Sequence, residues 1–504
     1  MPNKVRMAVG NIVIDANLPC SPNEVAEVLS ELRVDVPGAK FLYKYKSGEW
    51  DGKADLFRVV EVNGTGTQIR VPSGLFPAMY RACTARWKED GLHDLRGIPA
   101  TTLHPATVPL RPYQFEAISK AFGTNNELGW WPRAVIQVAT GGGKTEMAVA
   151  MYQMHPVSTM FLVHRKDLLY QAQERFKQYG IPCGIVGDGH FDIYNPGVTI
   201  ATMQTIASIL RKVREQIDVS KDPRMVHLVR AINTTHQVFF DEAHLMASNL
   251  DKGNQFIDIS NQFISAYSRW GLTATPFMRT QYDNLLLMGA TGDLACAVTN
   301  EQLISEGFLS VPTVYMRKVS GTMATTFKGN FRSSKATSKY WREVEERGIK
   351  YYSARNEIII REATAGPHPC LILVKTIEQA ESIKLKCQSM GVPFFPFLTG
   401  SAGAAERRQA VADMRKGNLP ILMATTIFDE GVDIPELRKV ILASGGKSPV
   451  KLLQRIGRGL RKADGKSTVQ IIDFTDTHHP MLQRHADERK ALWKSQGFNV
   501  KIER

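Results

Sequence analysis

The sequence of 504 residues has few cysteines and no long apolar segment. Its six cysteines form no CxxC pair, so neither a disulfide framework nor a cysteine-based metal site is expected, and a reducing compartment suits them. No run of 18 apolar residues occurs, which argues against a membrane-spanning helix. The first residues lack the basic and apolar regions of a secretion signal, so we expect a cytoplasmic protein.

The composition is that of a folded protein, with 43% hydrophobic and 22% charged residues. At roughly 150 residues per domain, the length suggests about three domains. Residues 1–104 are expected to form a small mixed α+β domain, and the stretch 98–109, rich in Thr and Pro, is expected to be a linker. Two larger domains are expected over residues 105–312 and 313–504.

The net charge of +14 is distributed unevenly. Residues 1–104 hold 13 basic and 12 acidic side chains, residues 105–312 hold 17 and 18, and residues 313–504 hold 33 and 19. The excess therefore lies in the last part of the chain. It predicts either a polyanionic partner such as nucleic acid or simply a basic soluble surface.

Short apolar runs alternate with amphipathic stretches after residue 105, which predicts parallel sheets covered by helices. The expected strands of the first sheet are Ala134–Val138, Thr159–His164, Val198–Thr202, Val238–Asp241 and Trp270–Thr273. Those of the second are Cys370–Val374, Pro393–Leu398, Ile421–Ala424, Val440–Ala443 and Val469–Phe474. Helices are expected at Asp167–Tyr179 and, docked on the second domain, at Met481–Gln496.

Three segments are of less regular character. Residues 41–52 alternate aromatic and basic side chains before Asp51-Gly52, which predicts a strand and a hairpin. Residues 318–340 hold five basic and no acidic residues and predict either a mobile surface insertion or a flexible nucleic-acid contact. His478, His479 and His485 lack cysteine or carboxylate partners at metal-ligand spacing, so no structural metal is expected.

A phosphate-binding loop is predicted where the strand Ala134–Val138 runs into Ala139-Thr-Gly-Gly-Gly-Lys-Thr145. Glycines let backbone N–H groups surround phosphate oxygens, and the N-terminus of the following helix attracts the same anion. The candidates for nucleotide binding here are Thr140, Gly141, Gly142, Gly143, Lys144 and Thr145. Lys144 would hold the β- and γ-phosphates, and the Thr145 hydroxyl would bind Mg²⁺.

A second nucleotide motif, Val238-Phe-Phe-Asp-Glu-Ala-His244, begins at an apolar strand and ends in two carboxylates. Asp241 lies 97 residues after Lys144, and such a strand can deliver its carboxylate to the metal. Glu242 would then polarise the water that attacks the γ-phosphate. The simpler alternative is a capped strand end.

In the second half, Gln454-Arg-Ile-Gly-Arg-Gly-Leu-Arg461 places three arginines three residues apart on one face of a helix. This face could be an ordinary solvated surface. It could also supply arginine fingers to phosphates held by the first domain, which would make hydrolysis depend on domain closure.

Together these segments resemble superfamily 2 helicases and translocases over roughly residues 108–475. The resemblance implies two RecA-like domains in tandem, ATP and Mg²⁺ as ligands, and catalytic roles for Lys144, Glu242, Gln454, Arg458 and Arg461. It also implies that Arg111 and Gln114, in Leu110-Arg-Pro-Tyr-Gln-Phe115, bind adenine and that Gly431 and Asp433 lie near the ribose. The segments Leu272-Thr-Ala-Thr-Pro276 and Ala424–Pro435 resemble motifs III and V of the family.

Within the superfamily, Tyr43-Lys-Tyr-Lys-Ser-Gly-Glu-Trp-Asp-Gly52 is similar to a segment of phage UvsW-type DNA helicases. This implies a small nucleic-acid-binding domain before the motor, action on branched DNA in recombination or repair, and the host cytoplasm if the chain is phage-encoded. The nearly neutral charge of residues 1–104 argues against strong binding, and a packed hairpin without ligand is the alternative.

A motor of this kind grips phosphates rather than bases. Side chains expected just after strands could contact a nucleic-acid strand: Arg165, Thr202, Thr376, Thr399, Thr425 and Thr426. For any single threonine, capping a helix is the alternative role.

We therefore expect a monomeric, nucleic-acid-stimulated ATPase with single-stranded or branched DNA as its partner. The alternatives are an RNA helicase, a restriction-type translocase that moves on duplex without separating strands, and an ATP-gated clamp without turnover.

Overall fold

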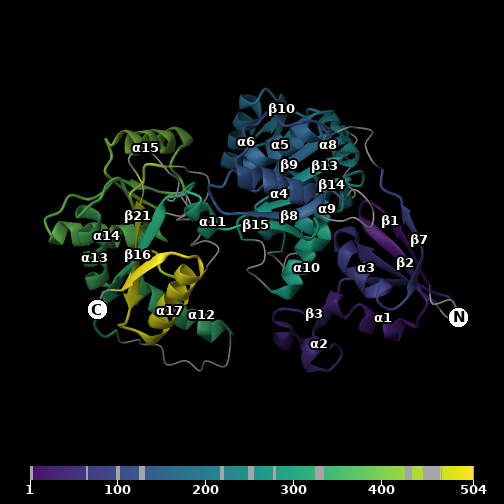
Figure 1. Ribbon diagram of the computed structural model, residues 1–504. Helices are drawn as coiled ribbons and strands as arrows, with labels where there is room; N and C mark the ends of the chain where they lie inside the picture. The colour runs from purple at the N-terminus through teal and green to yellow at the C-terminus, as the bar shows by residue number, and fades with distance from the viewer. Residues whose placement is uncertain are drawn as a thin grey trace. The chain divides into compact units, whose positions relative to one another are not determined.

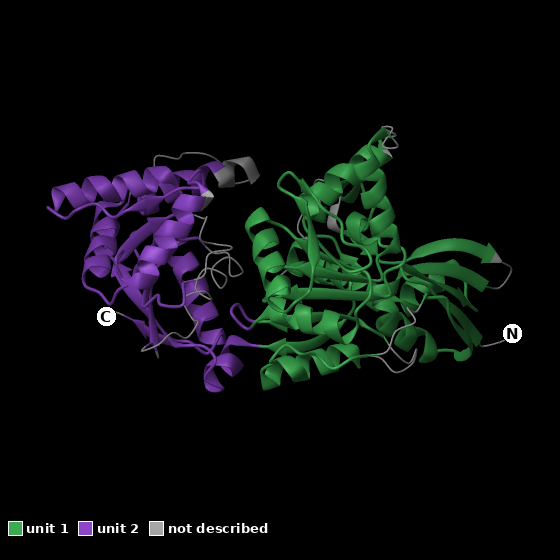
Figure 2. Cartoon of the chain, turned by 90° about the horizontal axis from the view of Figure 1, so that it is seen from above, with its two compact units in different colours: residues 1–138, 143–298 green, residues 139–142, 299–504 purple. Residues whose placement is uncertain are grey.

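The computed structural model describes residues 4–63, 66–97, 103–123, 131–215, 221–247, 255–275, 280–323, 334–425, 434–446, 466 and 468–502. The chain divides into two compact units, residues 1–138 with 143–298 and residues 139–142 with 299–504 (Figure 2). The first unit contains two of the three large sheets and the second contains one. None of the helices in the described ranges combines the length and apolar character that crossing a membrane requires.

The N-terminal sheet is mixed and has the strand order β5-β6-β2-β1-β7. Its strands are β1 (Lys4–Val9), β2 (Val13–Leu18), β5 (Arg58–Asn63), β6 (Gly66–Pro72) and β7 (Lys88–Asp94). The alternating burial of β1, β2 and β6 gives this sheet one apolar face. Helices α1 (Pro22–Val28) and α3 (Phe76–Thr84) contribute to its core, and β3 (Arg33–Asp35) pairs with β4 (Lys53–Asp55) beside them. The expected mixed α+β character is confirmed.

Residues 41–52 contain a short helix rather than a strand, so the prediction of a strand and hairpin here was wrong. Phe41 ends the 3-10 turn Ala39–Phe41, and α2 spans Tyr43–Lys46. The backbone N–H of Trp50 donates to the Lys44 carbonyl at 3.0 Å, which folds the following chain back onto α2. A turn does fall before β4, where Gly52 has a φ of +81°.

The first parallel sheet has the order β11-β10-β12-β9-β13-β14-β8-β15, and all of its pairings except β10–β11 are parallel. Its strands are β8 (Arg133–Val138), β9 (Thr159–Val163), β10 (Cys183–Gly187), β11 (His190–Phe191), β12 (Val198–Thr202), β13 (Gln237–Asp241), β14 (Ser268–Thr273) and β15 (Leu294–Val298). Its helices are α4 (Pro112–Phe122), α5 (Lys144–Met154), α6 (Lys166–Gln178), α7 (Met203–Arg214), α8 (Pro223–Thr234), α9 (Gln255–Ser260) and α10 (Gln281–Ala290). Its central strands are almost entirely buried, as expected for strands that helices cover.

The second parallel sheet has the order β18-β19-β17-β20-β21-β16-β22. Its strands are β16 (Val311–Val319), β17 (Cys370–Leu373), β18 (Phe397–Leu398), β19 (Ile421–Ala424), β20 (Lys439–Ile441), β21 (Thr468–Asp476) and β22 (Asn499–Ile502). Its helices are α11 (Asn300–Ser305), α12 (Ser334–Glu345), α13 (Ser353–Thr364), α14 (Ile377–Ser389), α15 (Ala404–Lys416) and α17 (Pro480–Ser495). Figure 1 shows each parallel sheet lying among helices, and the predicted class of two parallel-sheet α/β domains in tandem is confirmed.

The C-terminal helix α17 docks on β21, as the sequence predicted. Arg489 on α17 donates from Nε to Asp473 Oδ2 at 3.0 Å, and the Trp493 indole donates to the same oxygen at 2.9 Å. The neighbouring histidines pack in the same region. His479 caps α17, and the rings of His478 and Tyr352 stack with centroids 4.0 Å apart.

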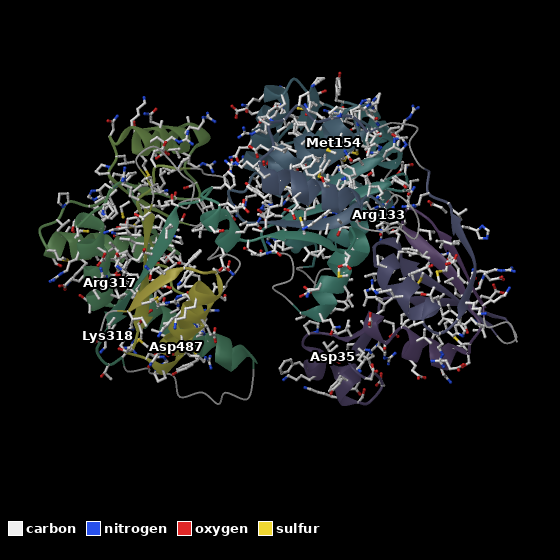
Figure 3. The ribbon with its side chains drawn as sticks, in the orientation of Figure 1. Asp35, Arg133, Met154, Arg317, Lys318 and Asp487 are labelled. Atoms are coloured by element: carbon white, nitrogen blue, oxygen red, sulfur yellow. The ribbon has the colours of Figure 1, made fainter. Side chains whose placement is uncertain are left out.

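Buried arginines join the N-terminal sheet to the first parallel sheet. Arg133 at the start of β8 donates to Ser73 Oγ and, at 3.1 Å, to the carbonyl oxygens of Ala266 and Tyr267. Its position between the two sheets is marked in Figure 3. Burial and the neighbouring Arg269 hold the pKa of Arg133 well below its usual range. These carbonyl and hydroxyl groups replace water around the guanidinium. Through Ser73 on one side and Ala266 and Tyr267 on the other, Arg133 connects the two sheets, which belong to one compact unit.

We predict that Arg133→Met lowers the free energy of unfolding by about 1–3 kcal/mol, since it leaves buried carbonyls without a donor. Chemical denaturation followed by fluorescence measures this change. Arg224→Met, at a side chain that is 72% exposed, is the matched control. A variant at position 133 as stable as the control would show that the buried hydrogen bonds contribute nothing to the docking.

Candidate active site

The loop between β8 and α5 has the backbone conformation that glycine favours. Gly141 has a φ of +89°, and Gly143, the N-cap of α5, has a φ of +81°. A Cβ atom on Gly143 would collide with the Gln114 side-chain amide nitrogen, so only glycine lets α4 approach the loop here. The loop leads directly into α5, whose N-terminus carries partial positive charge.

The start of α4 is fixed by its own side chains. The backbone N–H of Arg111 donates to Gln114 Oε1 at 2.9 Å, and the Arg111 guanidinium donates to the Tyr113 hydroxyl at 3.2 Å. Gln114 is only 4% exposed and lies against Gly143. Arg111 and Gln114, both predicted to bind adenine, therefore lie beside the end of the glycine loop.

The two carboxylates at the end of β13 face the lysine of the glycine loop. Lys144 Nζ donates to Glu242 Oε1 at 2.7 Å, and both side chains are largely buried, at 14% and 17% exposure. Glu242 has a φ of +50°, a strained value for a residue other than glycine, and its N–H donates to Asp241 Oδ1 at 3.0 Å. The structure thus brings together three residues that the sequence predicted to act together.

The two adjacent carboxyl groups have opposite pKa shifts. Burial and the charge of Glu242 raise the pKa of Asp241 above its ordinary value. Burial alone would also raise the pKa of Glu242, but Lys144 and His244 outweigh it and lower that pKa. A further cation beside Asp241 would therefore favour its charged form.

The site contains two residues that the sequence analysis did not single out, His244 and Thr273. His244 Nδ1 lies 2.9 Å from Thr273 Oγ1 on β14 and 3.4 Å from Glu242 Oε2. Thr273 Oγ1 also accepts from the backbone N–H of Thr275 at 3.2 Å. The only available signal was that His244 ends the segment Val238–His244 and that Thr273 lies in motif III. Their contact itself arises from the pairing of β13 with β14.

These residues fit a nucleoside triphosphate with a divalent cation. Gly141 and Gly143 have the positive φ angles that a phosphate-binding loop uses, and Lys144 at its end carries the charge that phosphates require. Asp241, whose charged form is destabilised by its surroundings, is an oxygen ligand of the type that Mg²⁺ prefers. Thr145 follows Lys144 in the first turn of α5.

Two of the predicted strand-contacting residues follow neighbouring strands of the first parallel sheet. Arg165 follows β9 as the N-cap of α6, and Thr202 ends β12 as the N-cap of α7. Thr202 Oγ1 accepts from the Thr205 N–H at 3.4 Å, so it performs the capping role that was the alternative. Because β9 and β12 pair in parallel with Thr202 opposite Val163, both residues lie at one edge of the sheet.

The corresponding residues of the second parallel sheet follow β17, β18 and β19, which are neighbours. Thr376 caps α14 by accepting from Gln379 N–H at 3.3 Å, and Thr399 Oγ1 lies 2.7 Å from Ser401 Oγ. Thr425 is buried, with its N–H donating to Leu398. The remaining predicted residues, Thr426, Gly431, Asp433, Gln454, Arg458 and Arg461, lie outside the described part of the chain.

Two tandem parallel-sheet units, with a glycine loop beside a pair of carboxylates, are typical of P-loop nucleotide-hydrolysing motors. Residues 107–278 match the family model described as "Type III restriction enzyme, res subunit", and residues 354–463 match "Helicase conserved C-terminal domain". The chain belongs to superfamily 2 of the helicases and translocases.

One relative is the "DNA 3'-5' translocase XPB2" of Sulfurisphaera tokodaii, which is 25% identical over 76% of this chain and 85% of its own. The chain covers between 50% and 66% of the length of three further curated relatives. The DNA-bound Type ISP restriction-modification enzyme LlaBIII matches in fold with a TM-score of 0.54, 16% identity, and coverage of 84% of this chain and 36% of its own. The crystal structure of T4 UvsW matches 99% of both chains at 16% identity, with a TM-score of 0.41 that is too low to assign a subgroup.

We predict that Asp241→Asn raises the stability of the protein at pH 7.5 without nucleotide or Mg²⁺. The folded pKa of Asp241 is raised, so the folded state binds more protons than the unfolded state above the ordinary carboxyl pKa, and stability falls as the pH rises through this range. The asparagine carries no charge and avoids this loss. Thermal unfolding of both proteins at pH 5 and pH 7.5 measures the effect.

The stability advantage of Asp241→Asn should shrink towards pH 5, where the wild-type carboxyl binds its proton. Glu27→Gln, at a side chain that is 75% exposed, is the control for removing one negative charge. A lower stability of Asp241→Asn than of wild type at pH 7.5 would contradict the predicted cost of this charge.

Proposed function

We propose that the chain is an ATP-dependent DNA helicase or translocase that moves on or remodels branched DNA in recombination, repair or replication-fork processing. The observation that supports this most is the contact of Lys144 with Glu242, and of Glu242 through His244 with Thr273. These contacts link the phosphate loop, the carboxylate pair and motif III, which follow the neighbouring strands β8, β13 and β14 of the sheet. A motor needs such a link between its nucleotide and its track.

In this proposal the nucleotide lies along the glycine loop. Residues 140–145 hold the phosphates, Arg111 and Gln114 bind adenine, and Gly431 with Asp433 lies near the ribose. Thr145 and Asp241 would hold Mg²⁺, which would supply positive charge to offset that of the phosphates. Lys144 holds the β- and γ-phosphates through its ammonium group.

Hydrolysis in this proposal needs residues from both halves of the sequence. The lowered pKa of Glu242 keeps its carboxylate ionised, so that it can orient and polarise the attacking water. Arg458 and Arg461, with Gln454 beside them, act as arginine fingers that stabilise charge on the transferred phosphoryl group. Hydrolysis would then proceed only in the domain arrangement that delivers these side chains.

DNA is the proposed track for three reasons. The relative XPB2 is named a DNA translocase, the excess positive charge lies in residues 313–504, and Gln454 replaces the histidine common in RNA helicases. Arg165, Thr202, Thr376, Thr399, Thr425 and Thr426 would contact the strand, with hydroxyls and helix N-termini directed at phosphates. We infer a monomeric motor that works in the cytoplasm, with domains over residues 1–104, 105–312 and 313–504.

One alternative has support of its own, a translocase that moves on duplex DNA without separating it. The family model over residues 107–278 is named for a restriction enzyme, and LlaBIII has a similar fold. An RNA helicase is the second alternative, since the Asp-Glu-Ala-His motif also occurs in that class.

We predict that Lys144→Ala lowers the ATP turnover rate by about 10²–10³-fold, the loss expected when one electrostatic stabiliser is removed. DNA binding measured by fluorescence anisotropy should be nearly unchanged. Lys120→Ala, at an exposed lysine on α4, is the control and should hydrolyse ATP normally. Turnover by Lys144→Ala at the wild-type rate would exclude the glycine loop as the phosphate site.

We predict that forked or single-stranded DNA raises ATP turnover several-fold, more than blunt duplex or RNA does. The stimulation should weaken with salt, because phosphate contacts release counterions. Steady-state ATPase assays with the four cofactors at 50 and 200 mM NaCl test both statements. Maximal stimulation by blunt duplex would favour the restriction-type translocase, and maximal stimulation by RNA would favour the RNA helicase.

A further inference from the structure

The longest run of exposed apolar side chains in the described parts of the chain lies at residues 41–45. Phe41, Leu42, Tyr43 and Tyr45 are exposed by 70%, 52%, 78% and 43%. They belong to the excursion between β3 and β4, residues 36–52, which we call the aromatic loop. Solvent-exposed rings in such a close group usually mark a binding surface.

The charges of the aromatic loop indicate the kind of ligand. Lys40, Lys44 and Lys46 alternate with the rings, and no described carboxylate forms an ion pair with them. The two acidic residues of the loop have partners nearby. Asp51 forms an ion pair with Arg33, and Glu49 accepts a hydrogen bond from the Ser47 hydroxyl. Lysines are depleted at protein–protein interfaces, whereas rings interspersed with cations suit bases and phosphates.

The base of the aromatic loop is closed by polar contacts. Arg33 on β3 contacts Asp51 at 2.5 Å and Asp55 at 3.0 Å, and both contacts keep the pKa of Arg33 raised. The N–H of Val36 donates to the Gly52 carbonyl at 2.8 Å. Asp35, the last residue of β3, marks this base in Figure 3.

The tip of the loop is held as well. The Trp50 indole donates to the Lys53 carbonyl at 2.7 Å, and its backbone N–H is bonded to the carbonyl of Lys44 in α2. The Tyr45 ring lies against Gly52, where a Cβ would come within 2.9 Å of it. A surface that is ordered before binding loses less entropy when its ligand arrives.

The aromatic loop is attached to the unit that carries Lys144 and Glu242. Strand β3 packs against α10 of the first parallel sheet, and Figure 1 shows β3 next to α10, with α2 beyond β3. Arg133 joins the N-terminal sheet to the same body. A ligand bound at the loop would therefore lie on the same compact unit as Lys144.

We propose that the aromatic loop is a binding site for unpaired DNA bases at the junction between single-stranded and duplex DNA. The rings of Phe41 and Tyr43 stack on bases, and Lys40, Lys44 and Lys46 contact the flanking phosphates. This inference rests on the proposed function, because it assumes that DNA is the track. It adds a contact that recognises unpaired bases to a motor whose other proposed contacts are to phosphates.

The direct test uses a DNA fork with 2-aminopurine as the first unpaired base, without ATP. Wild-type protein should change the probe's fluorescence through stacking. The double variant Phe41→Ala/Tyr43→Ala should lose this signal and bind the fork at least about 10-fold more weakly, the scale of base–aromatic stacking. Blunt duplex should be bound with equal affinity by both proteins.

Three further variants separate the roles of ring, hydroxyl and charge. Tyr43→Phe keeps the ring and should retain the signal. Lys44→Gln/Lys46→Gln should weaken fork binding and reduce its salt dependence while stacking persists. Tyr351→Ala, which removes a ring that is 51% exposed elsewhere, should behave as wild type. Unfolding temperatures check that each variant folds.

The results distinguish this inference from the proposed function. If wild-type ATP turnover responds to DNA but the double variant keeps both the stacking signal and the fork affinity, the inference is wrong and the function stands. If the double variant loses self-association instead of fork binding, the loop is a protein-docking surface and the inference is also wrong. If DNA never stimulates the wild-type protein, the proposed function fails, and a lost signal in the double variant would still establish the base contact.

Discussion

The active site depends on how one lysine offsets two adjacent carboxylates at the end of a buried strand. Asp241 and Glu242 cannot both carry charge in a buried position without a cation nearby. Lys144, 2.7 Å from Glu242, together with His244, stabilises the charge of Glu242 and leaves Asp241 with a raised pKa. The opposite pKa shifts of the two carboxyl groups suit different roles in the proposed mechanism. Asp241 is the metal ligand, and Glu242 is the ionised base.

Strand order explains how distant segments reach this site. β14 lies between β8 and β13, so the loop that carries Lys144 and the end of β13 are separated by one strand, although 97 residues separate Lys144 from Asp241. The intervening strand contributes Thr273, which contacts His244. Carboxyl ends of parallel strands share one edge, and the chain places its chemistry there. The strained backbone of Glu242, with a φ of +50°, is maintained by these surrounding contacts.

The parts of the fold that the sequence predicted well are strands buried on both faces. Such strands are continuous apolar runs, so Val198–Thr202 and Ile421–Ala424 were predicted to the residue. The other expected strands of both parallel sheets were found within a few residues, although only Phe397–Leu398 of the run Pro393–Leu398 forms a strand. Strands β10, β11, β15, β16 and β22 were missed. β15, β16 and β22 are only partly buried, so their sequences lack the continuous apolar signal, and β10 is a short run interrupted by two glycines. The contact of His244 with Thr273 could not be predicted, because it depends on which strands are neighbours.

The wrong prediction at residues 41–52 has a physical reason that bears on function. Alternating aromatic and basic residues favour a strand only where one face of that strand is buried. Here every side chain from Phe41 to Glu49 is exposed. With no core to select a strand, local contacts decide, and Gly38 and Gly48 in left-handed conformation bracket the short turns of the aromatic loop. Phe41 and Tyr43, exposed by 70% and 78%, contribute little to the stability of the fold. Their exposure on a loop closed by Arg33, Asp51 and Asp55 is the feature that the proposed base contact accounts for, since stacked bases would cover the exposed rings.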